Sequence, residues 1–282
     1  MLAGRPDIST VVDIGAGDGR LLAEIGIRAR QLRLIGLDLR SPEPATLPVT
    51  WLRGWWDVER EAWTAADSGR TTPLTDVLPT SDPLAIVAAE WLDELPAVVA
   101  GRGRDGAQET WREILVQGDG QELLGGPVAE PDAEWLDRWS PESARAESGR
   151  SRDRAWTTLL DCLRPAGGLA IIIDYGHQLD ERPARGTLAG YQHGHPVSPR
   201  PSSAINLTAH VAVDSVRAAG EAAGARTELL LRQREAVRRL LPDPPTEASD
   251  TLARLQLASE RRLLADNLGD HWWLVQSVDP KR

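Results

Sequence analysis

The chain has 282 residues, and its 41% hydrophobic and 26% charged content is typical of an ordinary globular protein. Its 42 acidic residues outnumber its 32 basic residues, which gives a net charge of −10. Nucleic-acid binding depends on positively charged side chains that neutralise the phosphates, so this excess of acidic residues argues against DNA or RNA as a partner. The single cysteine, Cys162, excludes an internal disulfide and a cysteine-based zinc site. We find no signal peptide and no apolar run long enough to span a bilayer, so we expect a cytoplasmic protein without a membrane partner.

The predicted elements alternate between strands and helices along the chain. A short apolar run at 10–14 predicts a buried strand, and leucines at helical spacing predict a helix over 19–30. The same reasoning gives a strand at 32–40 that ends in Asp38, a strand within 83–96 whose end is marked by Glu90, a helix at 151–164, a strand at 167–176, a helix at 208–224, and strands at 226–233 and 271–278.

This alternation predicts an α/β fold with a doubly wound, mainly parallel sheet. Two stretches interrupt it. Residues 97–128 are rich in glycine between modestly apolar runs, which predicts an antiparallel hairpin or meander. Residues 178–206 are rich in Pro, Gly, His and Ser, and we expect a long loop there, of the kind that forms lids. No repeat or linker is present, so residues 1–282 are expected to form one domain with these two insertions.

The stretch "TVVDIGAGDGRLLAEI", residues 10–25, places three glycines between the first strand and the first helix. Gly15, Gly17 and Gly19 read GxGxG, whereas a dinucleotide site reads GxGxxG. Asp13 stands next to the turn and would repel a pyrophosphate, but it suits S-adenosylmethionine, which carries an ammonium and a sulfonium. Asp38 could accept the ribose hydroxyls. The motif favours S-adenosylmethionine; a dinucleotide, or a glycine turn that only packs helix on strand with Asp13 as a helix cap, remain alternatives.

Acidic residues follow the third strand in "AAEWLDELP". Glu90, Asp93 and Glu94 should lie at the carboxyl edge of the sheet, where open α/β sheets bind their ligands. If a helix begins there, Glu90 and Asp93 share one of its faces. Two carboxylates match the donor fork of a guanidinium, so they could receive a cationic nucleophile. In the simpler interpretation, Asp93 and Glu94 only favour a helix N-terminus.

Five motifs occur in a fixed order: "VVDIGAGDGRLL", "IVAAEWLDELP", "GGLAIIIDYGH", "GTLAGY" and "INLTAHV". In this order the chain resembles the MidA family of S-adenosylmethionine-dependent methyltransferases over roughly residues 10–215. These bacterial proteins are similar to the mitochondrial methyltransferase that assists assembly of respiratory complex I. The resemblance implies a seven-stranded, Rossmann-like methyltransferase sheet, S-adenosyl-L-methionine as cofactor and, as in the mitochondrial member, arginine methylation. Family members carry a helical segment ahead of the glycine motif, which this chain is expected to lack.

The resemblance also implies roles for individual residues. The cofactor would be bound by Asp13, Gly15, Gly17, Gly19, Asp38 and Glu90. Catalysis would fall to the acidic pair Glu90 and Asp93 and to His177 of "DYGH", and the substrate would contact Tyr175, Thr208 and His210. Two positions depart from the family pattern: Ala89 stands where the family usually has Asn, and Asn206 stands where it has Asp.

Three functions follow from these observations. Methylation of a protein arginine is the principal expectation, with a carboxylate or His177 accepting a proton. A small-molecule O- or N-methyltransferase that uses residues 178–206 as a lid is the first alternative. The second is an assembly factor that binds the cofactor with little turnover, which Ala89 favours. His193 and His195 flank a glycine but lack further ligands, so no metal is expected. The sequence does not determine the oligomeric state.

Overall fold

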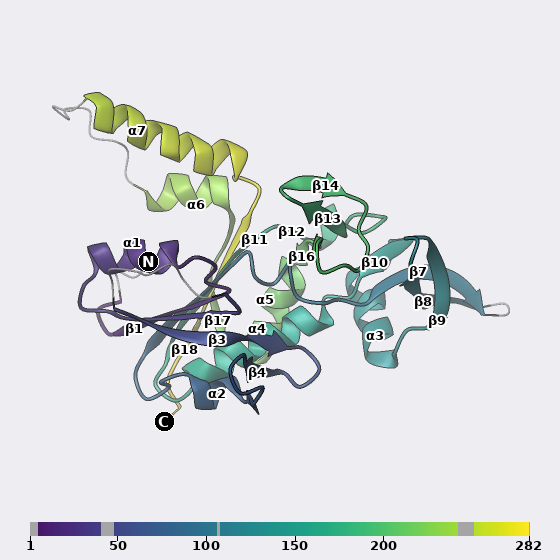
Figure 1. The fold of residues 1–282 in the computed structure, drawn as a ribbon, viewed down its shortest axis with the longest axis horizontal. Coiled ribbons are helices and arrows are strands. Elements are labelled where there is room, and N and C mark those ends of the chain that lie inside the picture. Colours follow the sequence, from purple (N-terminus) through teal and green to yellow (C-terminus); the bar gives the residue numbers. More distant parts are fainter. Residues whose placement is uncertain (1–4, 41–47, 106–107, 242–250, 282) are drawn as a thin grey trace.

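The computed structural model describes residues 5–40, 48–105, 108–241 and 251–281, and its centre is a nine-stranded sheet (Figure 1). The strand order is β17-β18-β11-β6-β1-β2-β3-β4-β5. The strands are β1 (Thr10–Ile14), β2 (Arg33–Asp38), β3 (Val49–Asp57), β4 (Ala62–Ala65), β5 (Thr71–Thr72), β6 (Leu84–Ala89), β11 (Gly168–Asp174), β17 (Arg226–Arg232) and β18 (Trp272–Val278).

The centre of the sheet is parallel, as predicted from the alternation of strands and helices. β3, β2, β1, β6 and β11 pair in parallel, so their carboxyl ends meet at one edge. β18 runs antiparallel between β11 and β17. The sheet exceeds the seven strands expected, because β4 and β5 turn back antiparallel from β3 and extend its edge.

Helices cover the sheet on both faces, because successive side chains of a buried strand point to opposite sides. On β1, Val12 belongs to the buried cluster that includes α4 (Arg150–Leu163), whereas Val11 belongs to the cluster with Leu22 of α1 (Arg20–Arg28). Helix α5 (Val213–Ala222) packs beside α4. Helix α1 lies within the predicted range 19–30, and α4 differs from the predicted range 151–164 by one residue at each end. The helix predicted at 208–224 is too long at its start, because Val211 and Ala212 pair as a strand and α5 begins only at Val213. The remaining helices are α2 (Leu74–Val77), α3 (Glu130–Trp139), α6 (Gln233–Leu240) and α7 (Thr251–Arg262), with a 3-10 helix, η2 (Leu179–Glu181), and a short π-helix, η3 (Leu263–Asn267).

The two interruptions of the pattern form small sheets of their own. Residues 97–128 contain three antiparallel strands, and a later strand completes a four-stranded sheet that projects to one side with α3 (Figure 1). Residues 178–206, expected as a long loop, contain η2 and most of a three-stranded sheet. The strands are β7 (Val99–Asp105), β8 (Gln108–Val116), β9 (Glu122–Pro127), β10 (Arg145–Glu147), β12 (Gly176–His177), β13 (Ala189–Gln192), β14 (His195–Val197), β15 (Asn206–Thr208) and β16 (Val211–Ala212).

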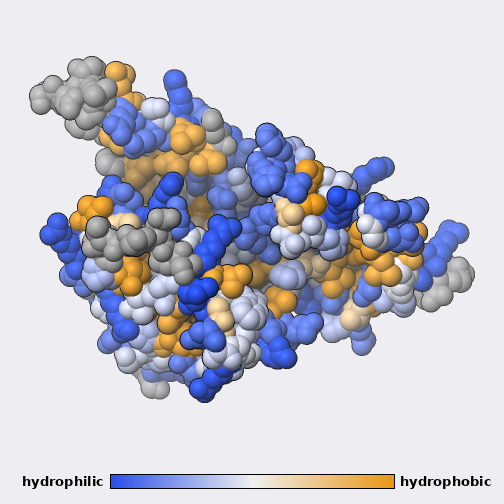
Figure 2. Space-filling model, viewed as in Figure 1, coloured by the Kyte–Doolittle hydropathy of each residue, from blue (hydrophilic) through white to orange (hydrophobic). Residues whose placement is uncertain are grey.

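Helices α6 and α7 project from the sheet and carry exposed apolar side chains. Figure 2 shows apolar side chains over α6 and the neighbouring part of α7, and the exposed leucines of this region are Leu240, Leu241, Leu255, Leu257 and Leu263. Within the part of the chain that the structure describes, no helix combines the length and hydrophobicity needed to cross a membrane.

The packing of α4 against the sheet predicts a large loss of stability on truncation. Leu159 of α4 is fully buried, so Leu159→Ala should lower the free energy of unfolding by about 2–5 kcal/mol through the lost apolar contact and the cavity left behind. Leu255 of α7 is 60% exposed and serves as the matched control, with an expected change within about 0.5 kcal/mol. Urea denaturation of both variants measures the difference, and equal losses would contradict this account of the core.

Candidate functional site

The glycine motif forms the turn between β1 and α1 with three left-handed residues. Gly15, Gly17 and Gly19 have φ angles of +74°, +57° and +79°, which residues other than glycine adopt only at a cost. Asp38, at the end of β2, connects this turn to the next strand. Its Oδ2 accepts the Gly17 N–H at 2.8 Å, and its Oδ1 accepts the Arg40 N–H at 2.7 Å. The turn and the end of β2 are therefore held as one unit.

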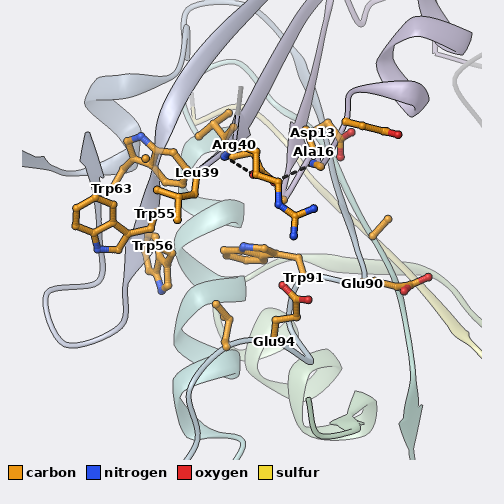
Figure 3. A pocket seen from close by; sticks show the side chains of 18 of the residues that line it. Asp13, Ala16, Leu39, Arg40, Trp55, Trp56, Trp63, Glu90, Trp91 and Glu94 are labelled. Atoms are coloured by element: carbon orange, nitrogen blue, oxygen red, sulfur yellow. Dashed lines mark hydrogen bonds between the residues drawn. The ribbon is translucent and has the colours of Figure 1, made fainter. Parts of the chain in front are cut away.

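A cavity of about 720 Å³ opens beside the turn, at the carboxyl edge of the sheet. The indole rings and carboxylates on its walls belong to Trp55, Trp56, Trp63 and Trp91 and to Asp13, Asp18, Asp38, Glu90 and Glu94 (Figure 3). Trp56 and Trp91 meet edge to face with ring centroids 6.3 Å apart. The Nε1 of Trp56 is buried and has no acceptor among the residues described. A buried donor without a partner is costly, so this N–H is suited to an acceptor on a ligand.

Asp13 is buried at the end of β1 and lines the same cavity. Burial, together with the charge of Asp38, raises the pKa of Asp13 to about 7. The residue before α1 is Gly19, and the N–H of Arg20 at the start of this helix donates to Asp18 Oδ1 at 3.2 Å, so the alternative of Asp13 as a helix cap is wrong. A cation in the cavity would stabilise the ionised form of Asp13.

The acidic segment after β6 is a loop, and the helix considered for it does not form. Glu90 adopts a left-handed φ of +49°, unusual for a residue with a side chain. The neighbouring strand fixes this loop: Asp174, at the end of β11, accepts the N–H groups of Leu92 at 3.0 Å and Asp93 at 3.3 Å. The Glu90 N–H donates to the Ile173 carbonyl at 2.9 Å. The loop therefore presents its acids through contacts with β11 rather than through helical spacing.

A second cavity, of about 320 Å³, adjoins the first, and Glu90 and Glu94 line both. It brings together five of the predicted catalytic and substrate residues, namely Glu90, Asp93, Tyr175, Thr208 and His210. Glu94, expected at this edge of the sheet without an assigned role, lines it too, and the structure adds residues that were not predicted for the site: Thr187, Ala189, Tyr191 and Asn206. Several of these come from 178–206, so the small sheet formed there is one wall of the cavity.

The three acids of this cavity differ in their surroundings. Asp93 is buried, which raises its pKa; the Thr208 hydroxyl donates to its Oδ2, and its Oδ1 has no donor among the described residues. Burial also raises the pKa of Glu94, whose Oε1 accepts the Asn206 amide at 2.9 Å. Interaction with His271 lowers the pKa of Glu90. The site thus offers acceptors of different basicity within one small volume.

His177 lies outside the acidic cavity, contrary to its predicted role as a catalytic base. The side chain is buried, and a guanidinium nitrogen of Arg182 is 2.7 Å from its Nδ1, so Nδ1 must accept the guanidinium hydrogen. Burial and the neighbouring cations lower the pKa of His177 to about 3. An imidazole held neutral with its lone pair occupied is a poor proton acceptor, and its contact with Arg182 supports the fold of the following segment instead.

Sequence reasoning missed the aromatic wall of the first cavity and His271. The segment "WLRGWW", residues 51–56, forms β3 and supplies two of the indole rings. The adjacency of these tryptophans to the end of the second strand could have indicated the wall. Figure 3 shows Arg40 extending toward Trp91 and Glu94 across this cavity, a cation that the sequence motifs did not point to.

Comparison with known proteins agrees with this geometry. A family model described as "Putative S-adenosyl-L-methionine-dependent methyltransferase" matches residues 28–230. The chain belongs to this methyltransferase family. Its cofactor is S-adenosyl-L-methionine. The matched range begins after the glycine turn, which includes Gly15, Gly17 and Gly19.

Two solved structures share the fold of this methyltransferase. One is a Burkholderia thailandensis protein bound to S-adenosyl-homocysteine, with 18% identity, a TM-score of 0.66, and coverage of 96% of this chain and 72% of that one. The other is a native structure of a protein from the same organism, with 20% identity, a TM-score of 0.66, and coverage of 96% and 74%. The curated proteins contain no match to the chain.

The buried Asp13 predicts a pH dependence of the methyltransferase's stability. Its pKa is about 7 in the fold against 3.8 in a free side chain, so between these values the folded protein binds more protons than the unfolded chain. The contribution of Asp13 to stability must therefore fall as the pH rises from about 4 to about 7. Asp13→Asn should remove this loss and be more stable than the parent at pH 8, by about 2–4 kcal/mol, with little difference below pH 4. Urea titrations of both proteins at pH 4, 6 and 8 measure the difference in their free energies of unfolding. A difference that does not change with pH would refute the raised pKa of Asp13.

Proposed function

We propose that this methyltransferase methylates the guanidinium group of a protein arginine and is a member of the MidA type. The acidic cavity beside the larger, tryptophan-lined cavity carries this proposal. Cofactor and substrate would occupy neighbouring spaces that share Glu90 and Glu94. A reacting nitrogen and the methyl group could then meet at the boundary between the two cavities.

The cofactor would lie in the larger cavity. Gly15, Gly17 and Gly19 would let it approach the turn closely, and the remaining acceptor capacity of Asp38 would take the ribose hydroxyls. Asp13 and Glu90 would face its cationic groups. The free N–H of Trp56 would meet an acceptor atom of the adenine or the carboxylate. Indole rings, carboxylates and an unpartnered donor together fit an adenine ring, a ribose, two cationic centres and a carboxylate.

The charge of the smaller cavity supports a cationic substrate. Three carboxylates line it, and none of the described residues that line it is Lys or Arg. An anionic substrate would be repelled, whereas a guanidinium presents five N–H donors to such acceptors. The unpartnered Oδ1 of Asp93 is suited to one of these donors. Tyr175, Tyr191 and His210 supply rings along which the apolar part of an arginine side chain can lie.

Bound S-adenosylmethionine supplies a methyl group already activated by its positively charged sulfur. The protein's own contribution is alignment, because holding two reactants in position removes much of the entropic barrier. Glu90 and Glu94 orient the guanidinium at the boundary of the cavities. Asp93, with a raised pKa, is the group best suited to accept the proton that the methylated nitrogen loses.

The glycine turn predicts a selective loss of cofactor binding. A Cβ at Gly15 would lie 2.8 Å from Cδ1 of Trp91, so Gly15→Ala must displace this indole ring from the cavity wall. Gly69, with φ of +66° and no atom within 4 Å of where a Cβ would stand, is the matched control for the left-handed backbone alone. Isothermal titration with S-adenosylhomocysteine should show at least about tenfold weaker binding for Gly15→Ala and a change within about twofold for Gly69→Ala. Equal affinities of the two variants for S-adenosylhomocysteine would show that the glycine turn is not part of the cofactor site.

The acidic pair predicts a loss of turnover. Asp93→Asn should reduce methyl transfer by about 100-fold or more, because the proton acceptor is removed while Asn retains an oxygen for Thr208. Glu90→Gln should also slow transfer, and Glu109→Gln, an acid of β8 that lines neither cavity, should not. Tritium transfer from labelled S-adenosylmethionine into a lysate, resolved into protein and small-molecule fractions, measures the rates.

The same experiment decides the proposed substrate. Label in protein that yields methylarginine on acid hydrolysis supports the proposal. Label confined to small molecules would establish the small-molecule alternative, and cofactor binding without transfer would establish the assembly-factor alternative. Wild-type rates in both Glu90→Gln and Asp93→Asn would show that the acidic cavity is not the site of the reaction.

A further inference from the structure

A buried histidine lies directly behind Glu90, outside the set of residues that line either cavity. His271 precedes β18, and its side chain is only 3% exposed. Its Nε2 lies 3.5 Å from Oε1 of Glu90. Its Nδ1 lies 2.8 Å from the Leu268 carbonyl, so Nδ1 carries a hydrogen and Nε2 is the nitrogen that titrates.

Glu90 is the acidic group that Nε2 of His271 faces, and this nitrogen has no hydrogen-bond partner among the residues described. Tyr175 covers the imidazole, with ring centroids 3.9 Å apart, and stacks on the ring of His210 at a centroid distance of 5.9 Å. The charge of Asp93 also raises the pKa of the imidazole, although Asp93 makes no hydrogen bond to it. The adjacent Asp270 is paired with Arg234, and Arg232 donates to the Asp270 carbonyl. The charge nearest to Nε2 is therefore that of Glu90.

We propose that His271 is the positioning residue for Glu90 and that a cationic substrate displaces it. The imidazolium holds the Glu90 carboxylate at the mouth of the acidic cavity until a guanidinium takes its place as the cationic partner. The inference rests on the proposed function, because it assigns the first contact of that substrate. Because the imidazolium then loses its anionic partner, binding of the substrate releases a proton from His271.

The geometry of Glu90 supports this role. Its backbone is fixed in a left-handed conformation at the end of β6, while its side chain is 59% exposed and free to reorient. An exposed carboxylate gains little from a surface ion pair, but here its partner is buried and cannot turn to water. Burial alone would lower the pKa of His271, yet Glu90 and the Leu268 carbonyl outweigh it and raise this pKa. A competing cation at Glu90 must then lower it again.

Two substitutions at position 271 separate positioning from packing. His271→Gln places an uncharged amide where Nε2 lies, and His271→Asn places one where Nδ1 lies, so only the glutamine can reach Glu90. With the substrate found by tritium transfer, KM of the parent should fall as the pH rises through the His271 titration. His271→Gln should show no such change, and His271→Asn should have a higher KM than His271→Gln. A merely structural histidine would give parallel pH profiles in the parent and both variants.

The titration itself can be followed by NMR on the full chain with labelled histidines, with His271→Gln identifying the signal. We expect the midpoint of His271 to lie about one pH unit lower in Glu90→Gln than in the parent, a tenfold change in proton affinity. Glu94→Gln, whose carboxylate is paired with Asn206, is the matched control and should move it much less. N-acetylarginine amide, a soluble guanidinium, should lower the midpoint in the parent but not in Glu90→Gln.

An unchanged midpoint in Glu90→Gln would overturn the pairing, and an unchanged midpoint with N-acetylarginine amide would overturn the displacement. Both results are independent of methyl transfer. If the midpoint moves in both cases but no guanidinium is methylated, the proposed function fails while the cation-responsive pair stands. If methylarginine forms and the midpoint stays fixed, the proposed function stands and His271 has no part in it.

Discussion

The acidic loop depends on one buried cation. Arg152 of α4 is 2% exposed and donates to the carbonyls of His210 at 2.9 Å, Asp93 at 3.0 Å and Leu95 at 3.4 Å. An arginine stays charged when buried, so nearby acids and carbonyls must offset the cost of removing its charge from water. Four acids act on it, namely Asp174, Asp93, Glu147 and Asp153. Arg152 thereby joins α4, the loop after β6 and the segment after β15, which are the three parts that carry the acids and the wall facing them.

The charges around Arg152 also explain why the acids differ. Asp174 is fully buried and uses its oxygens to accept three backbone N–H groups, those of Leu92, Asp93 and Tyr175. It fixes the loop and has little capacity left for a ligand. Asp93 receives one hydroxyl and keeps an oxygen free, while Glu90 stands at the surface. Within a few residues, one acid supports the structure and others remain available for binding and proton transfer.

The strands and the convergence of the acids were predictable from the sequence, whereas the walls of the cavities were not. Apolar runs with Asp13, Asp38 and Asp174 at or next to their carboxyl ends indicate parallel strands, and parallel strands bring these ends to one edge. Local spacing gave the wrong structure for residues 90–95, because contacts with β11 and Arg152 outweigh helical preference there. His271 was missed for a topological reason. β18 runs antiparallel to β11, so its beginning lies beside the end of β11, where Trp272 pairs with Asp174. Strand direction cannot be read from the apolar run itself.

The aromatic composition has a consequence for how freely this fold can change. The chain contains eleven tryptophans and no phenylalanine, so its largest rings bring an N–H into the interior. Trp156 donates to Gln276, Trp135 to Asp153 and Trp111 to Asp137, each at 2.7–2.8 Å. Replacing such a ring by phenylalanine would keep much of the volume but leave a polar atom without its partner. Each of these positions therefore requires a hydrogen-bond donor in a fixed direction as well as a ring of the right size. A tryptophan and its acceptor are more easily replaced together than one at a time.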